Sequence, residues 1–225
     1  YAAAHLLLDT RTEFPGASKE KPYIPVNYDG KYHGPVLMRY ALGNSLNVPA
    51  VKMLAQVGLE NMLETAYQMG FTTLKPTAEN LSKFGLAVTL GGGEVRLIEM
   101  AGAYAAFANG GLKVEPTAIL KVENQEGKVL EEAKPIKGKQ VLTQGEAFII
   151  SDILADNNAR LISFGANSLL NIPGRQVAVK TGTTNNMKDN WAIGWTPQVL
   201  VGVWVGNNDN SSMKQVASGI SGASP

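Results

Sequence analysis

The chain has 225 residues, of which 44% are hydrophobic and 17% charged, and its formal net charge is +1. This composition supports a packed core and excludes global disorder, and the lack of a basic block argues against nucleic acid as a partner. With no cysteine and two histidines, the chain cannot form disulfides, a thiolate nucleophile or a three-histidine metal site. No run approaches the ~20 apolar residues of a membrane span.

The first half of the chain is predicted to be mainly helical. Residues 1–28 are rich in turn formers and charge, which indicates an extended surface segment with a short strand at Leu6–Leu8. Gly34-Pro35 and Pro49 then precede apolar runs, and proline suits the first position of a helix. Three helices are expected here, over Val36–Leu42, Ala50–Gln56 and Leu59–Met69.

A fourth helix is expected over Leu97–Ala108. Its residues are apolar on nearly all sides, a pattern typical of a buried helix. A β-ribbon follows, with Thr117–Val122 and Lys128–Glu131 on either side of a glycine-containing loop. Gln144–Asp156 then has the pattern of an amphipathic helix.

The last third of the chain is predicted to be β-structure. Three strand-length runs rich in β-branched residues and tryptophan occur at Gln176–Lys180, Asn190–Trp195 and Val199–Val205. Short connections favour sequential antiparallel pairing. Helices and strands in blocks favour an α+β fold, an antiparallel β-sheet flanked by helices, and residues 1–225 are interpreted as a single domain.

Two short motifs carry chemistry. Lys180-Thr181-Gly182-Thr183-Thr184 lies at the end of a predicted strand. It combines a positive charge, hydroxyl donors and a glycine that lets a substrate backbone approach. Ser45-Leu46-Asn47 lies in a break between two helices, where a hydroxyl and an amide could relay a proton and hold a carbonyl. Taken singly, the first also fits a strand entering a polar turn, and the second also fits helix capping.

Together the motifs resemble the class A penicillin-binding proteins, whose superfamily signature is Ser-x-x-Lys, Ser-Asp-Asn and Lys-Thr-Gly. Leu46 replaces the central aspartate, as is usual for the biosynthetic enzymes. The resemblance runs nearly end to end. Its carriers are Asn27-Tyr28-Asp29-Gly30, Tyr32-His33-Gly34-Pro35, Ala41 to Val51, Leu90-Gly91-Gly92-Gly93-Glu94-Val95, Ala103-Tyr104, Phe107-Ala108-Asn109-Gly110-Gly111, Lys180 to Thr184, Asp189-Asn190-Trp191 and Val203-Trp204-Val205-Gly206-Asn207.

The resemblance implies the transpeptidase domain of a peptidoglycan synthase. Such an enzyme cross-links stem peptides through a serine acyl-enzyme and is trapped by β-lactam antibiotics, with no metal or organic cofactor. It also implies an extracytoplasmic location, a membrane anchor outside this chain and an upstream glycosyltransferase domain. A D,D-carboxypeptidase or β-lactamase-type hydrolase and a non-catalytic binding module on the same fold remain alternatives.

Individual roles follow from the same resemblance. Ser45 would pass a proton to the leaving nitrogen with help from Lys180, and Asn47 would hold the donor's side-chain amide. The implied substrate-binding residues are Thr181, Gly182, Thr183 and Thr184. Among these, Thr181 and Thr183 would bind the carboxylate of the donor or drug, and the Thr183 N–H would be one oxyanion donor.

The nucleophile itself is expected outside these residues. Tyr1 resembles the tyrosine of the Pro-Phe-x-Tyr that follows Ser-x-x-Lys in the family, which places the nucleophile helix upstream and leaves the chain inactive by itself. The Ser-x-x-Lys pattern occurs twice within the chain, at Ser18 to Lys21 and at Ser211 to Lys214. Both are expected in loops, whereas a serine and its lysine base need one helix face. Neither is predicted to be the nucleophile.

Overall fold

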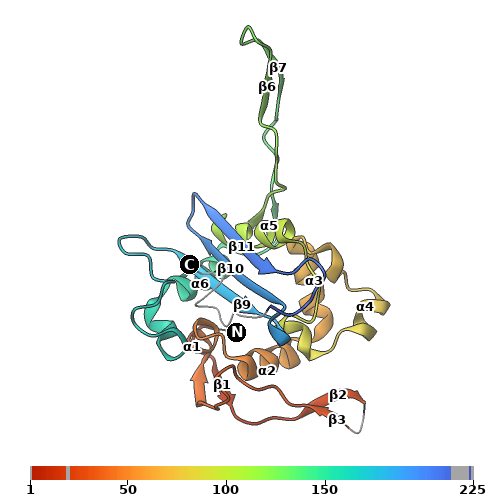
Figure 1. Cartoon of the computed structure of the whole chain (residues 1–225), viewed down its shortest axis with the longest axis vertical. Helices are drawn as coiled ribbons and strands as arrows, with labels where there is room; N and C mark the ends of the chain where they lie inside the picture. Colours follow the sequence, from red (N-terminus) through yellow and green to blue (C-terminus); the bar gives the residue numbers. More distant parts are fainter. Residues whose placement is uncertain (1, 19–20, 214–222, 224–225) are drawn as a thin grey trace.

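The centre of the fold is a three-stranded antiparallel sheet (Figure 1). The computed structural model describes residues 2–18, 21–213 and 223. The strands are β9 (Ala178–Thr183), β10 (Asp189–Trp195) and β11 (Leu200–Gly206), in the order β11-β10-β9. The predicted sequential antiparallel pairing is therefore confirmed. The Thr196 hydroxyl accepts hydrogen bonds from the N–H groups of Gln198 and Val199 and so closes the β10–β11 turn.

Two helices, α5 (Leu97–Ala108) and α6 (Gln144–Ala155), pack on the sheet. Leu154 of α6 lies against Ala178, Ile193 and Trp195 of the sheet, and aromatic residues of α5 complete this cluster. A capping box starts α6, because the Thr143 hydroxyl accepts from the Glu146 N–H while the Glu146 carboxylate accepts from the Thr143 N–H. The α+β class inferred from the sequence is thus the one observed.

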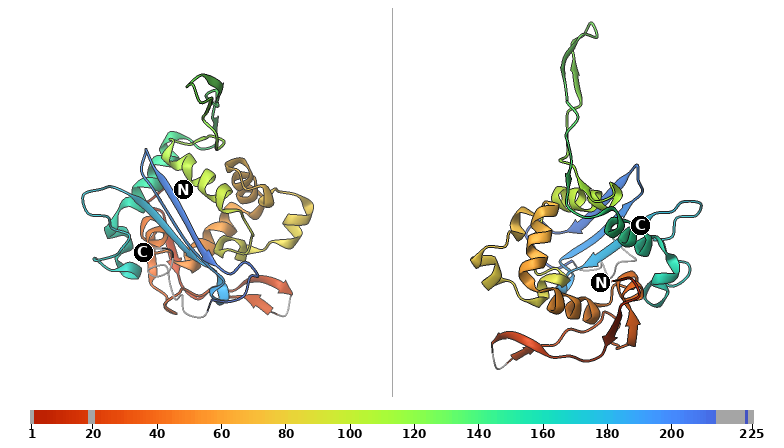
Figure 2. Two further views of the ribbon diagram at one scale, coloured as in Figure 1. Left: turned by 45° about the horizontal axis from the view of Figure 1, so that its top comes forward. Right: turned by 180° about the vertical axis from the view of Figure 1, so that it is seen from behind.

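A helical part lies beside the sheet, as both views of Figure 2 show. Its helices are α1 (Met38–Gly43), α2 (Asn47–Val57), α3 (Leu59–Met69), η1 (Thr72–Leu74), α4 (Ala78–Lys83) and η2 (Leu86–Leu90). Besides the cluster against the sheet, three apolar clusters are buried, built around Leu7 and Val36, around Leu63 and Phe84, and around Ala103 of α5. Within the described residues, no helix has the length and apolarity needed to cross a membrane.

The remaining elements are short. Four two-stranded sheets pair β1 with β4, β2 with β3, β5 with β8 and β6 with β7. Their bounds are β1 (Leu6–Asp9), β2 (Phe14–Ser18), β3 (Lys21–Tyr23), β4 (Gly34–Leu37), β5 (Leu112–Lys113), β6 (Lys121–Glu123), β7 (Val129–Glu132) and β8 (Lys139–Gln140). Three short helices complete the fold: η3 (Asn157–Arg160), α7 (Leu161–Phe164) and η4 (Asn185–Met187).

The helix predicted over Val36–Leu42 is present, but its predicted start is two residues too early. Residues Gly34–Leu37 form β4, which pairs with β1 so that Leu7 lies opposite Val36 and Leu8 opposite Pro35. The short β1 strand needs a partner for its backbone, and Val36 buries its side chain beside Leu7. The helix begins only at Met38.

Three other expectations need correction. Helix α5 is not buried on all sides, because Leu97 and Ile98 are 41% and 59% exposed. The segment before residue 28 contains the β2–β3 hairpin in addition to the expected strand at β1. Strand β9 runs through Thr183 and does not end at Lys180, so the Lys-Thr-Gly motif lies within the strand.

Candidate active site

Ser45 occupies a strained position at the end of α1. The Ser45 N–H donates to the Leu42 carbonyl and the Leu46 N–H to the Ala41 carbonyl, which is the Schellman pattern of a helix end. Glycine usually takes the left-handed residue of this motif, but here Ser45 has φ of 56°. A non-glycine residue in this region costs on the order of 1 kcal/mol. This geometry fixes the hydroxyl of Ser45 between α1 and α2.

Lys180 of β9 meets that hydroxyl. Its Nζ donates to Ser45 Oγ at 2.7 Å and to its neighbour's carbonyl, Thr181 O, at 2.6 Å. Burial, and to a lesser degree the positive charge of Arg160, lower the pKa of Lys180 to about 8. An amine with such a pKa can both give and accept a proton near neutral pH, so the pair has the chemistry of a proton relay.

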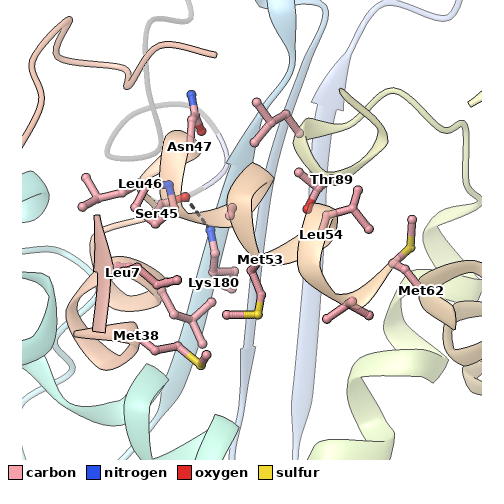
Figure 3. Close-up of a pocket in the computed structure, with 16 residues that line it drawn as sticks. Leu7, Met38, Ser45, Leu46, Asn47, Met53, Leu54, Met62, Thr89 and Lys180 are labelled. Atoms are coloured by element: carbon pink, nitrogen blue, oxygen red, sulfur yellow. Dashed lines mark hydrogen bonds between the residues drawn. The ribbon is translucent and has the colours of Figure 1, made fainter. Parts of the chain in front are cut away.

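Asn47 lies close by but is oriented differently. It is the first residue of α2, three residues earlier than the predicted start of this helix at Ala50. It lines the same cavity as Ser45 and Lys180, yet its Nδ2 donates to the Val26 carbonyl at 2.8 Å. Its amide is turned away from the Lys180 ammonium (Figure 3). The structure therefore joins Ser45 to Lys180 directly and leaves Asn47 beside them.

The hydroxyl groups of Thr183, in β9, and of Thr184, which follows it, are engaged in hydrogen bonds within the protein. Thr181 is only 8% exposed. Thr183 Oγ1 accepts from Asn190 Nδ2 at 3.1 Å. Thr184 Oγ1 donates to Asp189 Oδ2 at 2.8 Å and accepts from the Asp189 N–H at 3.0 Å. These bonds hold the connection between β9 and β10.

Packing within the chain does not require a glycine at position 182. A Cβ at this position would meet only the Trp191 Cβ, at an ordinary contact distance of 3.7 Å. A side chain would therefore fit against the protein itself. The glycine leaves open space beside the strand, where another backbone could approach.

Sequence reasoning missed Asn44, which holds the Ser45 turn in place. The Asn44 side chain is buried, and its Nδ2 donates to the carbonyls of Tyr40 and Ala159 at 2.9 and 2.8 Å. Its Oδ1 accepts from the Ser163 N–H at 2.9 Å, and its backbone carbonyl accepts from the Ser163 hydroxyl. We name this set of contacts the Asn44 clamp. Asparagine's preference for turns was a signal for its place but not for its partners.

Arg160 was also missed. It is 3% exposed, it donates to the Leu154 carbonyl, and its positive charge acts on Lys180. Burial lowers the pKa of Arg160 itself, although the Asp156 carboxylate opposes this. A buried arginine near Lys180 disfavours the charged form of the amine, which supports the relay described above.

A largely apolar cavity of about 380 Å³ opens beside the Ser45–Lys180 pair (Figure 3). Its polar lining is confined to Ser45, Asn47, Thr89 and Lys180. The other lining side chains come mainly from α1 and α2, with contributions from β1, α3 and η2. They include Leu7, Met38, Leu42, Met53, Leu54 and Met62.

The serines of the two internal Ser-x-x-Lys matches do not lie on helices. Ser18 ends β2 and is paired with Lys21 across the β2–β3 hairpin, so the first match is not on a helix. Ser211 is in an irregular exposed segment, and Lys214 lies outside the described residues. Ser211 does not line the cavity beside Lys180.

A lysine of a Lys-Thr-Gly strand that faces a serine in a helix break defines the class of penicillin-recognising acyltransferases and hydrolases. Comparison with known families gives a more specific result. Residues 8–222 match the family described as the penicillin binding protein transpeptidase domain. The chain belongs to this family, and the resemblance found in the sequence is confirmed.

Several relatives illustrate the match. The chain is 36% identical over 202 residues to penicillin-binding protein 1A of Aquifex aeolicus, covering 90% of the chain and 26% of that protein. It is 34% identical over 220 residues to penicillin-binding protein 2D of Bacillus subtilis, covering 94% of the chain and 30% of that protein. The chain thus spans less than a third of the length of these two relatives.

Solved structures show the same fold. Penicillin-binding protein 1A from Haemophilus influenzae superposes with a TM-score of 0.79 at 24% identity, covering 93% of this chain and 35% of that one. The PonA1 protein from Mycobacterium tuberculosis in complex with penicillin V gives a TM-score of 0.77 at 24% identity. The match covers 99% of this chain and 59% of that one.

Proposed function

We propose that this chain is part of the D,D-transpeptidase domain of a bacterial peptidoglycan synthase that cross-links stem peptides and binds β-lactams. The observation that carries the proposal is the 2.7 Å hydrogen bond from Lys180 Nζ to Ser45 Oγ. This bond joins the Ser45 motif to the Lys180 motif. A helix cap at Ser45-Leu46-Asn47 and a polar turn after Lys180 would not require such a contact. Family membership supports a serine acyl-transfer reaction over other uses of this pair.

In the proposed reaction a serine Oγ attacks the carbonyl of the penultimate D-Ala of a stem peptide. The peptide bond breaks, the amine of the terminal D-Ala takes a proton and leaves, and an ester joins the peptide to the serine. Ser45 passes that proton to the leaving nitrogen, and Lys180 receives or supplies it in turn. An amine of a neighbouring stem then attacks the ester carbonyl and loses a proton to form the cross-linking amide, while the ester bond breaks and the serine Oγ takes up a proton.

We place the nucleophile and its lysine base in a segment outside these 225 residues, and we propose that this segment binds in the apolar cavity. The cavity is lined mainly by leucine, methionine and alanine, which suits the apolar face of a helix. Ser45 and Lys180 lie in its wall, within reach of a helix bound there. The chain as printed would then not be acylated by penicillin.

The donor peptide would bind along β9. Within the described residues β9 is an edge strand of the sheet, and an extended peptide can add to such an edge. The open space at Gly182 admits its backbone, and Thr181 and Thr183 would bind its carboxylate. For this, the Thr183 hydroxyl could donate to the carboxylate while still accepting from Asn190.

The remaining proposals concern the longer protein. The two relatives named above extend well beyond the matched region. We propose that a glycosyltransferase domain and a membrane anchor lie in that additional length. The domain described here would then act outside the cytoplasm, where stem peptides are joined.

Intact mass spectrometry after incubation with a labelled penicillin tests the proposal. The longer protein should gain one adduct, and Ser45→Ala or Lys180→Ala should slow its formation by ~10²-fold or more, the range for losing an acid–base group. Ser211→Ala is the matched control and should leave the rate unchanged. No adduct on the longer protein would favour a non-catalytic module. Release of hydrolysed stem peptide without cross-linked product would favour the hydrolase.

An adduct on a protein verified to begin at Tyr1 would refute the external nucleophile. Peptide mapping of that adduct would then identify the serine responsible.

A further inference from the structure

A long ribbon projects from the body of the protein at β6 and β7 (Figures 1 and 2). We define the ribbon as residues 117–136. Many of its apolar side chains face solvent, and a two-stranded ribbon by itself is at best marginally stable in water. The exposed fractions are 66% for Ile119, 70% for Leu120, 36% for Val122, 45% for Val129, 63% for Leu130 and 48% for Ile136.

The outer edge of β6 offers unpaired backbone groups. Leu120 O accepts from the Ala133 N–H, and the Asn124 N–H donates to Lys128 O, so these two residues point toward β7. Because backbone groups alternate along a strand, the N–H and C=O of Lys121 and Glu123 point away from β7. No strand among the described residues pairs with this edge.

We propose that a second copy of this chain binds here, with the two β6 strands pairing antiparallel about a two-fold axis at Val122. In this register Lys121 lies opposite Glu123 of the second copy, and Glu123 lies opposite its Lys121. The outward backbone groups of these residues then face one another, as an antiparallel hydrogen-bonded pair requires. The result is a four-stranded sheet across an isologous interface.

In that register each charged side chain of β6 lies opposite a side chain of the other sign in the second copy. Lys121 Nζ already lies 2.7 Å from Glu123 Oε1 in one chain, with both side chains exposed. In the dimer, each lysine would have a glutamate beside it and another opposite, and opposite charges across strands are stabilising. On the other face, the exposed side chains of Leu120 and Val122 would cover those of the second copy.

The edge of β7 is less suited to pairing. The ladder shifts register between Val122 and Glu123, which leaves Leu130 of β7 as an extra residue in a bulge. Pro135 follows shortly after β7 and has no N–H. Bulges and prolines are two of the features by which natural edge strands avoid pairing, and β6 has neither at residues 121–123.

Single-cysteine variants test the register, because the chain contains no cysteine. Residues facing each other at the axis have Cα atoms ~4.5 Å apart, within the range of a disulfide. Val122→Cys should therefore form a disulfide-linked dimer under mild oxidation at tens of micromolar protein. Leu120→Cys places its two thiols about 13 Å apart, since four residues of strand separate their levels, and should stay monomeric. Ala133→Cys, directly after β7, should form a disulfide-linked dimer only if two copies pair through β7.

Charge reversal gives a second, independent test in the Val122→Cys background. Lys121→Glu or Glu123→Lys alone puts like charges opposite each other twice and should lower the cross-linking rate about fivefold or more. The double variant restores complementarity and should recover the rate. Lys134→Glu makes the same charge change on the β7 side and should have no effect.

Equal cross-linking of all three cysteine variants, no cross-linking of Val122→Cys, or failure of the double charge swap to recover the rate would each overturn the proposal. Faster reaction of Ala133→Cys would assign the interface to β7 and would also overturn it. The readout is dimer formation and needs no enzymatic activity. Its outcome is therefore independent of the function proposed above.

Discussion

Replacing Asn44 by alanine removes the side-chain part of the Asn44 clamp. Three hydrogen bonds are lost: those to the carbonyls of Tyr40 and Ala159 and the one from the Ser163 N–H. Asn44 is 3% exposed, so water cannot freely replace them. At about 1 kcal/mol for each net hydrogen bond, Asn44→Ala should lower the free energy of unfolding by about 3 kcal/mol.

Urea denaturation followed by tryptophan fluorescence measures this loss. Asn61→Ala is the matched control, because the Asn61 Nδ2 also donates to a backbone carbonyl, that of Val57, but at an exposed position of α3. Surface substitutions of this kind usually change stability by less than about 0.5 kcal/mol. If Asn44→Ala were no more destabilising than Asn61→Ala, the clamp would not be a significant source of stability, and the reasoning on Ser45 would lose its support.

Further predictions concern neighbouring residues. Gly43→Ala should lower the free energy of unfolding by about 2 kcal/mol or more, because the added Cβ would lie 2.5 Å from the Ala159 carbonyl oxygen. Gly145→Ala adds a Cβ in open space on α6 and should be neutral or stabilising. Equal effects of the two variants in urea unfolding would contradict the prediction for Gly43. Thr143→Ala should cost about 1 kcal/mol through loss of the α6 cap. Thr65→Ala should cost much less, because the Thr65 hydroxyl bonds only to the Asn61 carbonyl at an exposed position of α3. Lys180 should make stability depend on pH. The folded protein releases this proton at a pKa of about 8 and the unfolded chain near the ordinary ~10.4, so unfolding takes up a proton between these pH values and the free energy of unfolding rises with pH. Lys180→Met should remove that rise and Lys31→Met should retain it; an unchanged slope in Lys180→Met would show that the pKa of Lys180 is not lowered.

The sequence by itself determined the elements whose signals are local. The three β-strands of the central sheet and helices α3, α5 and α6 were predicted within a few residues of their observed bounds. Their apolar runs and short connections leave few alternatives. Ser45 and Lys180 were also identified as partners, but through family resemblance, because no local pattern links residues 135 positions apart.

Only the tertiary structure decided how the backbone and polar groups are satisfied. Gly34–Leu37 reads locally as the start of a helix, but pairing with β1 makes it a strand. The amide of Asn47 bonds to Val26, and that of Asn44 bonds to Ala159, which lies 115 residues away. Such partners are brought close by packing of distant segments, and each buried polar group must take the partner that packing supplies. For this reason the sequence located the Ser45 turn, while only the fold showed what holds it.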